Sequence, residues 1–296
     1  MYLVAEHLVQ EEQAGRVYDY AQGLFPLLPS RKSVKKALDK GLLKVNGQAV
    51  GTGYYLQTGD VLALWQRPVN QKERELPLEV HYEDDDLALV YKPAGIAVSG
   101  YHKHNFQQRF QAGLQPSSAE DALPSPLPVH RLDLPTQGLL LVGKRASSLR
   151  FLQAAFAQRK VQKTYLAVVM GRPTQAKGRL DSPVDGKAAE TDYRLLWSVP
   201  SLRSGQLSLL ELRPKTGRKH QLRQQLAQID CPIVGDKQYG PKGKTLLHKG
   251  LFLVSIGLAF PHPAGDQLEL SMPAPTKFLR LLERERRQWE KYQPLV

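Results

Sequence analysis

The chain has 296 residues, more than a single domain usually contains, so we expect one large core and a smaller second domain. Its 41 Lys and Arg residues against 28 Asp and Glu residues give a net charge of +13, which favours a polyanionic partner, nucleic acid first. The single cysteine excludes an intramolecular disulfide and a Cys-based zinc cluster, and no apolar run approaches the roughly 20 residues of a membrane span. We therefore expect a cytoplasmic protein with no signal peptide, membrane anchor or metal.

Residues 30–40 predict a short amphipathic helix with one strongly basic face. Val34, Ala37 and Leu38 have the i, i+3, i+4 spacing of a buried stripe, and lysines and an arginine surround it. The helix belongs to a small basic domain that we place at residues 1–66. A solvated basic helix on an ordinary α+β module is the alternative to an RNA-binding surface.

The same region contains a hairpin signal at Asn46-Gly47 and a strand at Val61–Trp65. A lysine-bearing helix followed by Gly-x-x-x-Val-Asn-Gly and then Gly-Asp resembles the S4-type RNA-binding domain. The resemblance implies RNA contacts from the helix, through Arg31, Lys32, Lys35 and Lys36.

Residues 67–76 are polar, with Pro68 inside the segment and Pro77 directly after it, which indicates a linker, and we assign 77–296 to a second domain. Strands at 78–81 and 87–91 flank the acidic turn Glu83–Asp86, which we interpret as a solvated turn rather than a metal site. The interval 102–128 is weakly patterned apart from a short helix near 106–112.

The rest of the second domain alternates strands with a few helices. Residues 146–160 predict a helix with Ser147 as its N-cap, and Thr216-Gly217 is expected to open another helix. The predicted strands are 139–142, 162–171, 178–197, 205–214 and 251–258, and a charged helix covers 278–292. Partial alternation in these strands favours an α+β fold with a mixed, mainly antiparallel sheet and helices packed on it, not a parallel nucleotide-binding sheet.

Asp133 is the first candidate for chemistry. It lies two residues after Arg131, in a turn closed by Pro135 and Gly138, directly before the apolar run 139–142. A carboxylate in a loop braced by a buried strand can act on a ligand, although an isolated Arg-x-Asp is more often a surface pair.

The string His-Arg-Leu-Asp-x-x-Thr-x-Gly-Leu-Leu-Leu around Asp133 resembles the active-site signature of the RluA-type pseudouridine synthases. Three further phrases follow the same family in order: Lys92-Pro-Ala-Gly, Lys163-x-Tyr-x-Ala-x-Val and Lys215-Thr-Gly-Arg-x-His-Gln-Leu-Arg. Gln137 and Lys219 depart from it, where the family usually has Ser and Thr or Ser.

The resemblance implies that Asp133 is the catalytic carboxylate, that Tyr165 stacks on the uracil ring and that Arg223 forms a salt bridge with Asp133. Basic side chains at a helix start also suit a phosphate. The expected substrate-binding residues are His130, Arg131, Thr136, Lys215, Arg218, Lys219 and His220.

The reaction expected from the resemblance is isomerisation of specific uridines in structured rRNA or tRNA to pseudouridine, with the target base flipped out of its stack. It is internal to the nucleotide, so it needs no cofactor. We expect RNA as the partner and a monomeric enzyme. The alternatives are an inactive RNA-binding protein on the same scaffold and a two-carboxylate hydrolase, for which the sequence nominates no second acid.

Overall fold

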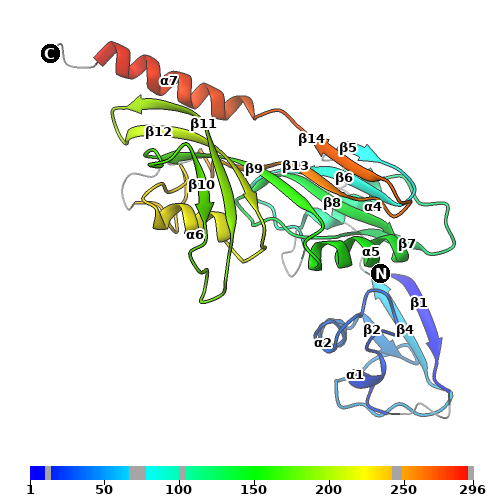
Figure 1. Cartoon of the computed structure of the whole chain (residues 1–296). Coiled ribbons are helices and arrows are strands. Elements are labelled where there is room, and N and C mark those ends of the chain that lie inside the picture. Colours follow the sequence, from blue (N-terminus) through cyan, green and yellow to red (C-terminus); the bar gives the residue numbers. More distant parts are fainter. Residues whose placement is uncertain (11–14, 67–77, 100–104, 242–248, 293–296) are drawn as a thin grey trace. The chain divides into compact units, whose positions relative to one another are not determined.

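The computed structural model describes residues 1–10, 15–66, 78–99, 105–241 and 249–292 (Figure 1). The chain divides into two compact units, Met1–Glu75 and Leu76–Val296, and each has its own hydrophobic core. No helix in the described parts is long and apolar enough to cross a bilayer. The predicted linker at 67–76 falls outside the described residues.

The N-terminal unit is an antiparallel sheet with two helices. Its strand order is β1-β4-β2-β3. The bounds are β1 Tyr2–Leu8, α1 Val17–Tyr20, α2 Arg31–Asp39, β2 Leu43–Val45, β3 Gln48–Ala49 and β4 Val61–Gln66.

Helix α2 forms as its sequence predicts. The hydroxyl of Ser30 caps it by accepting the Ser33 N–H at 3.3 Å, and Val34, Ala37 and Leu38 are buried. The hairpin between β2 and β3 turns at Asn46-Gly47, where both residues have positive φ angles of 49° and 78°. Strand β1 and helix α1 were not predicted, and the S4 assignment remains a prediction.

The larger unit is built on a ten-stranded sheet. The strand order is β10-β11-β12-β9-β13-β8-β6-β5, with β14 paired to β13 and β7 paired to β8. The strands are β5 Glu79–Glu83, β6 Leu87–Lys92, β7 Ala122–Pro128, β8 Gln137–Arg145, β9 Gln162–Met170, β10 Lys177–Leu180, β11 Thr191–Ser201, β12 Gly205–Pro214, β13 Leu253–Pro261 and β14 Gln267–Ser271.

Of the pairings in this sheet, β13 with β8 is parallel and the others are antiparallel. The predicted α+β class with a mixed, mainly antiparallel sheet is therefore confirmed. Strand β8 is buried over Gln137–Lys144, as expected for a continuous apolar run at the centre of a sheet.

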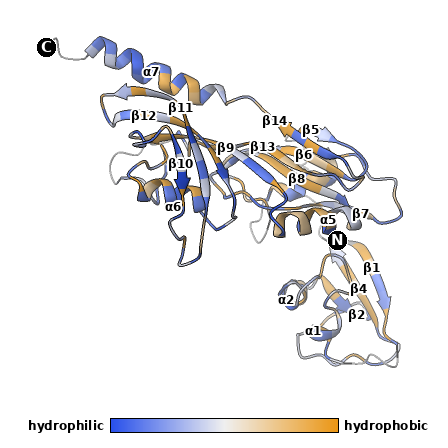
Figure 2. Ribbon diagram, viewed as in Figure 1, coloured by the Kyte–Doolittle hydropathy of each residue, from blue (hydrophilic) through white to orange (hydrophobic). Residues whose placement is uncertain are grey.

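The helices pack on the sheet. They are η2 Phe106–Arg109, α4 Phe110–Gly113, α5 Ala146–Ala157, α6 Gln221–Gln228 and α7 Thr276–Tyr292. Helix α5 contacts β8, and α7 contacts β11 and β12. Apolar and polar stretches alternate along α7 (Figure 2), because one face is buried and the other is in solvent.

Helix α5 begins differently from the prediction. Arg145 occupies the N-cap position, and the Ser147 hydroxyl does not cap the helix. The carboxylate of Asp121 accepts the Ser147 N–H at 2.8 Å instead. A side chain distant in sequence thus satisfies a free donor at this helix start, so the prediction of Ser147 as N-cap is wrong.

The acidic turn between β5 and β6 is tied into the fold. Asp84 accepts the N–H groups of Asp86 and Leu87 and the Tyr82 hydroxyl, and it lies 2.8 Å from His262 Nε2. Asp84, Asp86 and His262 lie close enough to share a cation, with ligand atoms within 4.8 Å of one another. Hydrogen bonds within the protein already satisfy Asp84, so we assign the turn a structural role.

Candidate active site

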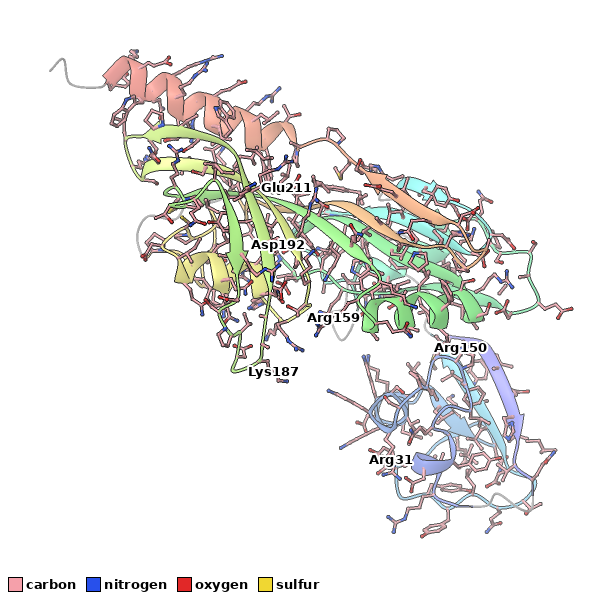
Figure 3. The ribbon with its side chains drawn as sticks, viewed as in Figure 1. Arg31, Arg150, Arg159, Lys187, Asp192 and Glu211 are labelled. Carbon is pink, nitrogen blue, oxygen red and sulfur yellow. The ribbon has the colours of Figure 1, made fainter. Side chains whose placement is uncertain are left out.

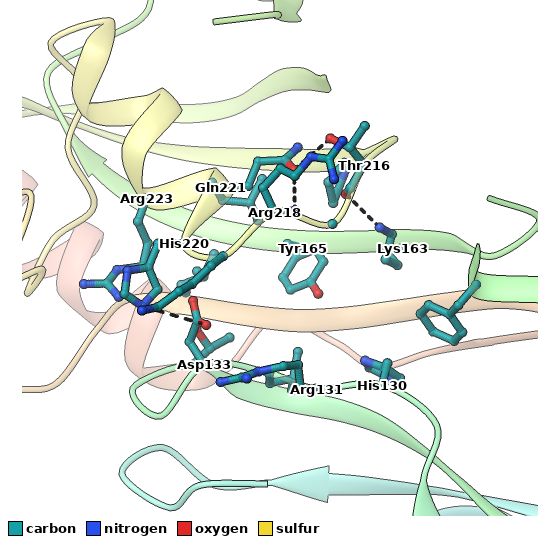
Figure 4. Close-up of a pocket in the computed structure, with 18 residues that line it drawn as sticks. His130, Arg131, Asp133, Lys163, Tyr165, Thr216, Arg218, His220, Gln221 and Arg223 are labelled. Atoms are coloured by element: carbon teal, nitrogen blue, oxygen red, sulfur yellow. Dashed lines mark hydrogen bonds and ion pairs between the residues drawn. The ribbon is translucent and has the colours of Figure 1, made fainter. Parts of the chain in front are cut away.

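A pocket of about 460 Å³ opens beside the Asp133 loop (Figure 4). Three segments line most of it. They are residues 130–136, Lys163 and Tyr165 on β9, and residues 216–223, which lead into α6. Asp133 is the one carboxylate among the residues that line this pocket.

The loop that carries Asp133 folds back on β8. The Val129 N–H donates to the Leu141 carbonyl at 2.9 Å, and the Leu141 N–H donates to His130 Nε2 at 3.1 Å. The Thr136 N–H donates to the Asp133 carbonyl at 3.0 Å. These bonds leave the Asp133 side chain 20% exposed, at the pocket wall.

Lys92 braces the loop from inside the core. It is fully buried, and its ammonium donates to the carbonyls of Pro93 at 2.9 Å, Ile96 at 2.8 Å and Leu134 at 3.4 Å. Burial lowers the pKa of Lys92 to about 8, an effect that nearby Asp133 opposes. The Lys-Pro-Ala-Gly phrase was recognised in the sequence, but this function of its lysine was not.

Gly138 lets the strand after the loop reach the sheet. Its φ angle is 118°, and a Cβ atom there would lie 2.1 Å from the carbonyl oxygen of Ser255. The two residues are partners where β8 joins β13. Only glycine fits this backbone contact, which explains a glycine directly before the apolar run.

Tyr165 lines the pocket from β9, and its ring is among the side chains drawn in Figure 4. The residue is half-buried. Burial raises the pKa of its phenol to about 12, so the ring is neutral at physiological pH. A neutral aromatic face in a pocket suits stacking on a planar base.

Arg223 does not form the predicted salt bridge with Asp133. Its Nε and Nη2 atoms donate to the two carboxylate oxygens of Asp236, at 2.7 and 2.8 Å. Asp236 is 1% exposed and also accepts the N–H groups of Gln238 and Tyr239. The bidentate, buried geometry holds the guanidinium on Asp236, so the predicted partner is wrong although Arg223 does line the pocket.

Among the described residues, His220 is the basic side chain nearest to Asp133 for which an ion-pair distance is reached, with its Nε2 at 4.0 Å from Oδ1. Its Nδ1 lies 3.0 Å from the Tyr239 hydroxyl, and its φ angle of 56° turns the chain just before α6. Burial lowers the pKa of His220. It therefore faces Asp133 mainly as a neutral imidazole at pH 7.

His130 supports the loop more than it faces the substrate. Besides accepting the Leu141 N–H, its ring stacks on Phe156, with centroids 4.7 Å apart and planes at 21°. Burial lowers its pKa to about 4. Phe156 and Lys163 both line the pocket, and neither was among the predicted site residues.

Thr136 lines the pocket, is 3% exposed and has no hydrogen-bond partner for its hydroxyl among the described residues. A buried hydroxyl left without a partner is available to a ligand.

Basic side chains also surround the pocket. Arg131, Arg218 and Lys219 are exposed and line it. Lys163 donates to the Thr216 carbonyl at 3.0 Å, and burial lowers its pKa to about 8. Lys215 does not line the pocket. It pairs with Asp192 at 3.2 Å on the strand surface, where Figure 3 labels Asp192, so the structure does not bring it to the predicted site.

The helix expected to open at Thr216-Gly217 begins at Gln221. The side-chain oxygen of Gln221 accepts the Arg218 N–H at 3.0 Å and the Thr216 hydroxyl at 2.7 Å. The segment before the helix is thus a loop fastened by Gln221. A phosphate here would meet the exposed side chains of Arg218 and Lys219.

The predicted RNA-binding residues of α2 belong to the other unit. Lys32 and Lys35 are exposed, Lys36 is half-buried, and Arg31, labelled in Figure 3, pairs with Asp19 at 2.9 Å.

Comparison with known proteins assigns this chain to a family. The family described as RNA pseudouridylate synthase matches residues 86–228. A ribosomal large subunit pseudouridine synthase C of Rickettsia felis is 32% identical over 299 residues, covering 90% of this chain and 95% of that relative. An uncharacterized RNA pseudouridine synthase of Bacillus subtilis, YlyB, is 30% identical over 279 residues, covering 87% of this chain and 90% of that relative.

Among solved structures, human RNA pseudouridylate synthase domain containing 4 superposes with a TM-score of 0.57 at 24% identity, over 70% of this chain and 93% of that one. That similarity concerns the fold. The chain belongs to the RNA pseudouridine synthase family, and it is an isomerase of uridine in RNA.

Proposed function

We propose that this enzyme isomerises specific uridines in structured ribosomal or transfer RNA, with Asp133 as its catalytic carboxylate. The observation that carries the proposal is the presence of one carboxylate in a pocket that also holds a neutral aromatic ring and is surrounded by basic side chains. Relatives named ribosomal large subunit pseudouridine synthases favour ribosomal RNA.

The reaction breaks the N1–C1′ bond, turns the uracil and forms a C5–C1′ bond. The hydrogen on C5 leaves as a proton, and N1 takes one up, so no oxidant, reductant or outside group is needed. Asp133 can serve as a nucleophile at C1′ or as the base that removes the C5 proton. In either function its carboxylate must be held in place, which the contacts of its loop with β8 and Lys92 support.

The detached uracil must stay in the pocket between bond breaking and bond making. We assign this to Tyr165, because its ring is neutral and lines the pocket beside Asp133. A base stacked in an RNA helix cannot reach such a site, so the target nucleotide must be flipped out. Arg131, Arg218 and Lys219 would then hold the flanking phosphates.

We assign Arg223 an electrostatic function. Its pairing with Asp236 fixes the guanidinium without neutralising Asp133, and His220 stands at 4.0 Å from the carboxylate. The Arg223 cation interacts with the negative charge of Asp133 through space, and its pair with Asp236 limits the net field that reaches Asp133.

We further propose that the N-terminal unit is an S4-type RNA-binding domain. The exposed Lys32 and Lys35, beside Lys36 and Arg31 on α2, form the surface that would contact phosphates. An inactive RNA-binding protein on the same scaffold is the second reading, and the presence of Asp133, Tyr165 and Arg223 in one pocket argues against it.

Tritium release from RNA labelled at uridine C5 tests the catalytic assignment, since forming the C5–C1′ bond expels that hydrogen. We expect release by the wild type, and a loss of at least about 10³-fold in Asp133→Asn, because the carboxylate takes part in the chemistry. Asp181→Asn is the matched control, as its carboxylate is exposed and does not line the pocket. Release by Asp133→Asn at the wild-type rate would refute the assignment.

A further inference from the structure

Helix α7 places four cations in a line. Arg280, Arg284, Arg287 and Lys291 recur every three or four residues, and all four are exposed. At 3.6 residues per turn they fall within an arc of about 60° and extend over about 16 Å of helix. We call them the α7 cation row.

The opposite face of α7 fixes the direction of the row. Phe278, Leu281 and Leu282 are buried against the sheet. Glu285 is buried with them, where it accepts the Ser201 hydroxyl at 2.8 Å. The helix cannot rotate without exposing this face, so the four cations are held toward solvent, away from β11 and β12.

Carboxylates on the helix leave most of the row without an ion pair. Arg284 bonds to Glu285 at 2.9 Å. Glu290 pairs with Arg286, which lies outside the row, at 3.6 Å. Among the ion pairs of the described residues, none involves Arg280, Arg287 or Lys291. Glu283, at the edge of the row, is the carboxylate that remains exposed beside it.

We propose that the α7 cation row binds the phosphate backbone of the RNA substrate, outside the pocket. Evenly spaced cations on a rigid helix complement a chain of evenly spaced phosphates, and each phosphate contact releases counterions. A membrane surface fits less well, since an interfacial helix must insert an apolar face, and that of α7 is already buried in the protein.

The proposal rests on the proposed function in one respect, that RNA is the substrate. None of the four residues lines the Asp133 pocket. The row therefore contacts RNA at a distance from the flipped nucleotide. A long folded RNA should depend on it, while a short hairpin that only fills the pocket should not.

The test uses the full chain with Arg280→Gln, Arg287→Gln and Lys291→Gln combined. Binding to a labelled transcript of a large-subunit ribosomal RNA domain is titrated at several KCl concentrations, beside a short uridine-containing hairpin. For the transcript we expect the slope of log K against log [salt] to fall by about 3 and the affinity to weaken by about tenfold or more. For the hairpin we expect affinity within about twofold of the wild type.

Two single variants provide the matched control. Arg286 and Arg287 are adjacent and exposed, but only Arg287 belongs to the row. Arg287→Gln should lower the salt slope by about 1, and Arg286→Gln should leave it unchanged. Equal slopes for the two, or a triple variant that binds the transcript as the wild type does, would overturn the proposal. So would a triple variant that loses only its binding to phosphatidylglycerol vesicles.

Binding is read independently of chemistry, so the two proposals fail separately. If the wild type releases tritium and the triple variant keeps the full salt slope, only the α7 cation row is refuted. If the slope falls as expected and the wild type releases no tritium, only the isomerase assignment for this site is refuted. Circular dichroism of each variant checks that the exposed substitutions leave the fold intact.

Discussion

His130 shows how a residue inside a catalytic signature can serve the scaffold. Its imidazole accepts a backbone N–H from β8 and stacks on Phe156, so the neutral ring is built into the loop that presents Asp133. Protonation would remove the acceptor and place a charge in a buried site. The carboxylate is thus positioned by a group that must remain uncharged.

This makes the free energy of unfolding depend on pH. The pKa of His130 is about 4 in the folded chain and about 6.5 when unfolded, so the unfolded state binds more protons between these values. Stability contributed by His130 is complete above pH 6.5 and is lost as the pH falls toward 4, by about 2 to 3 kcal/mol. Urea unfolding of the wild type and of His130→Asn at pH 6.8 and pH 4.2 measures this loss of stability. Equal pH sensitivity of the two proteins would contradict this function.

At the same scale, the sequence could identify the pocket but not all of its pairings. Asp133, Tyr165 and Arg223 do line one pocket. Asp236, the partner of Arg223, lies thirteen positions further along the chain, after α6. Whether Arg223 pairs with Asp133 or with Asp236 depends on how the loop after α6 folds back. No local sequence pattern predicts the path of that loop. Lys163 and Phe156 were not predicted as site residues, because a lysine on a strand and a phenylalanine on an amphipathic helix usually have only a structural role.

At the scale of elements, the junction of β8 and β13 fixes the end of the loop that carries Asp133. It is the parallel pair in the sheet, and it brings Gly138 onto Ser255 directly beside the Asp133 loop. The strands with continuous apolar runs, such as β8, could be read from the sequence. Strand β7 contains three prolines, and β14 alternates intermediate and exposed positions, so pairing with a neighbour rather than local preference makes them strands.

Substituting Gly138 tests this junction. Gly138→Ala should destabilise the protein by about 3 kcal/mol or more, through both its positive φ angle and the collision with the Ser255 carbonyl. Gly265→Ala is the control, since Gly265 has a similar φ of 110° but nothing within 4 Å of the added methyl group. We expect about 1 kcal/mol for it, measured by urea unfolding. A difference near zero between the two variants would mean that the close contact is relieved at little cost.

At the scale of the whole molecule, the two units have separate cores. The core of the N-terminal unit runs from Val9 to Leu64, and the three other clusters contain only residues beyond position 76. Composition and the polar segment 67–76 were the basis for the predicted domain boundary. The domain family of the N-terminal unit is harder to predict from the sequence, because different short basic α+β domains have the same helix and turn signals.

Separate cores predict separate folding. The fragment 76–296 should unfold cooperatively by itself and release tritium from a short hairpin at a rate within about threefold of the full chain, since the whole pocket belongs to it. Its affinity for a long transcript should fall, with a smaller salt slope, because the basic face of α2 is gone. Thermal unfolding and salt titrations measure both. A fragment that folds but is inactive on the hairpin would show that the N-terminal unit takes part in the chemistry.

The strand order also determines at what point during synthesis the pocket can assemble. Strand β13, at residues 253–261, lies between β9 and β8, which precede it by about a hundred residues. A nascent chain can pair β6 with β8, and β9 with β12, as they emerge, but the walls that carry Asp133 and Tyr165 stay unjoined until β13 enters the gap. We therefore expect a nascent chain that ends before β13 to lack an assembled pocket.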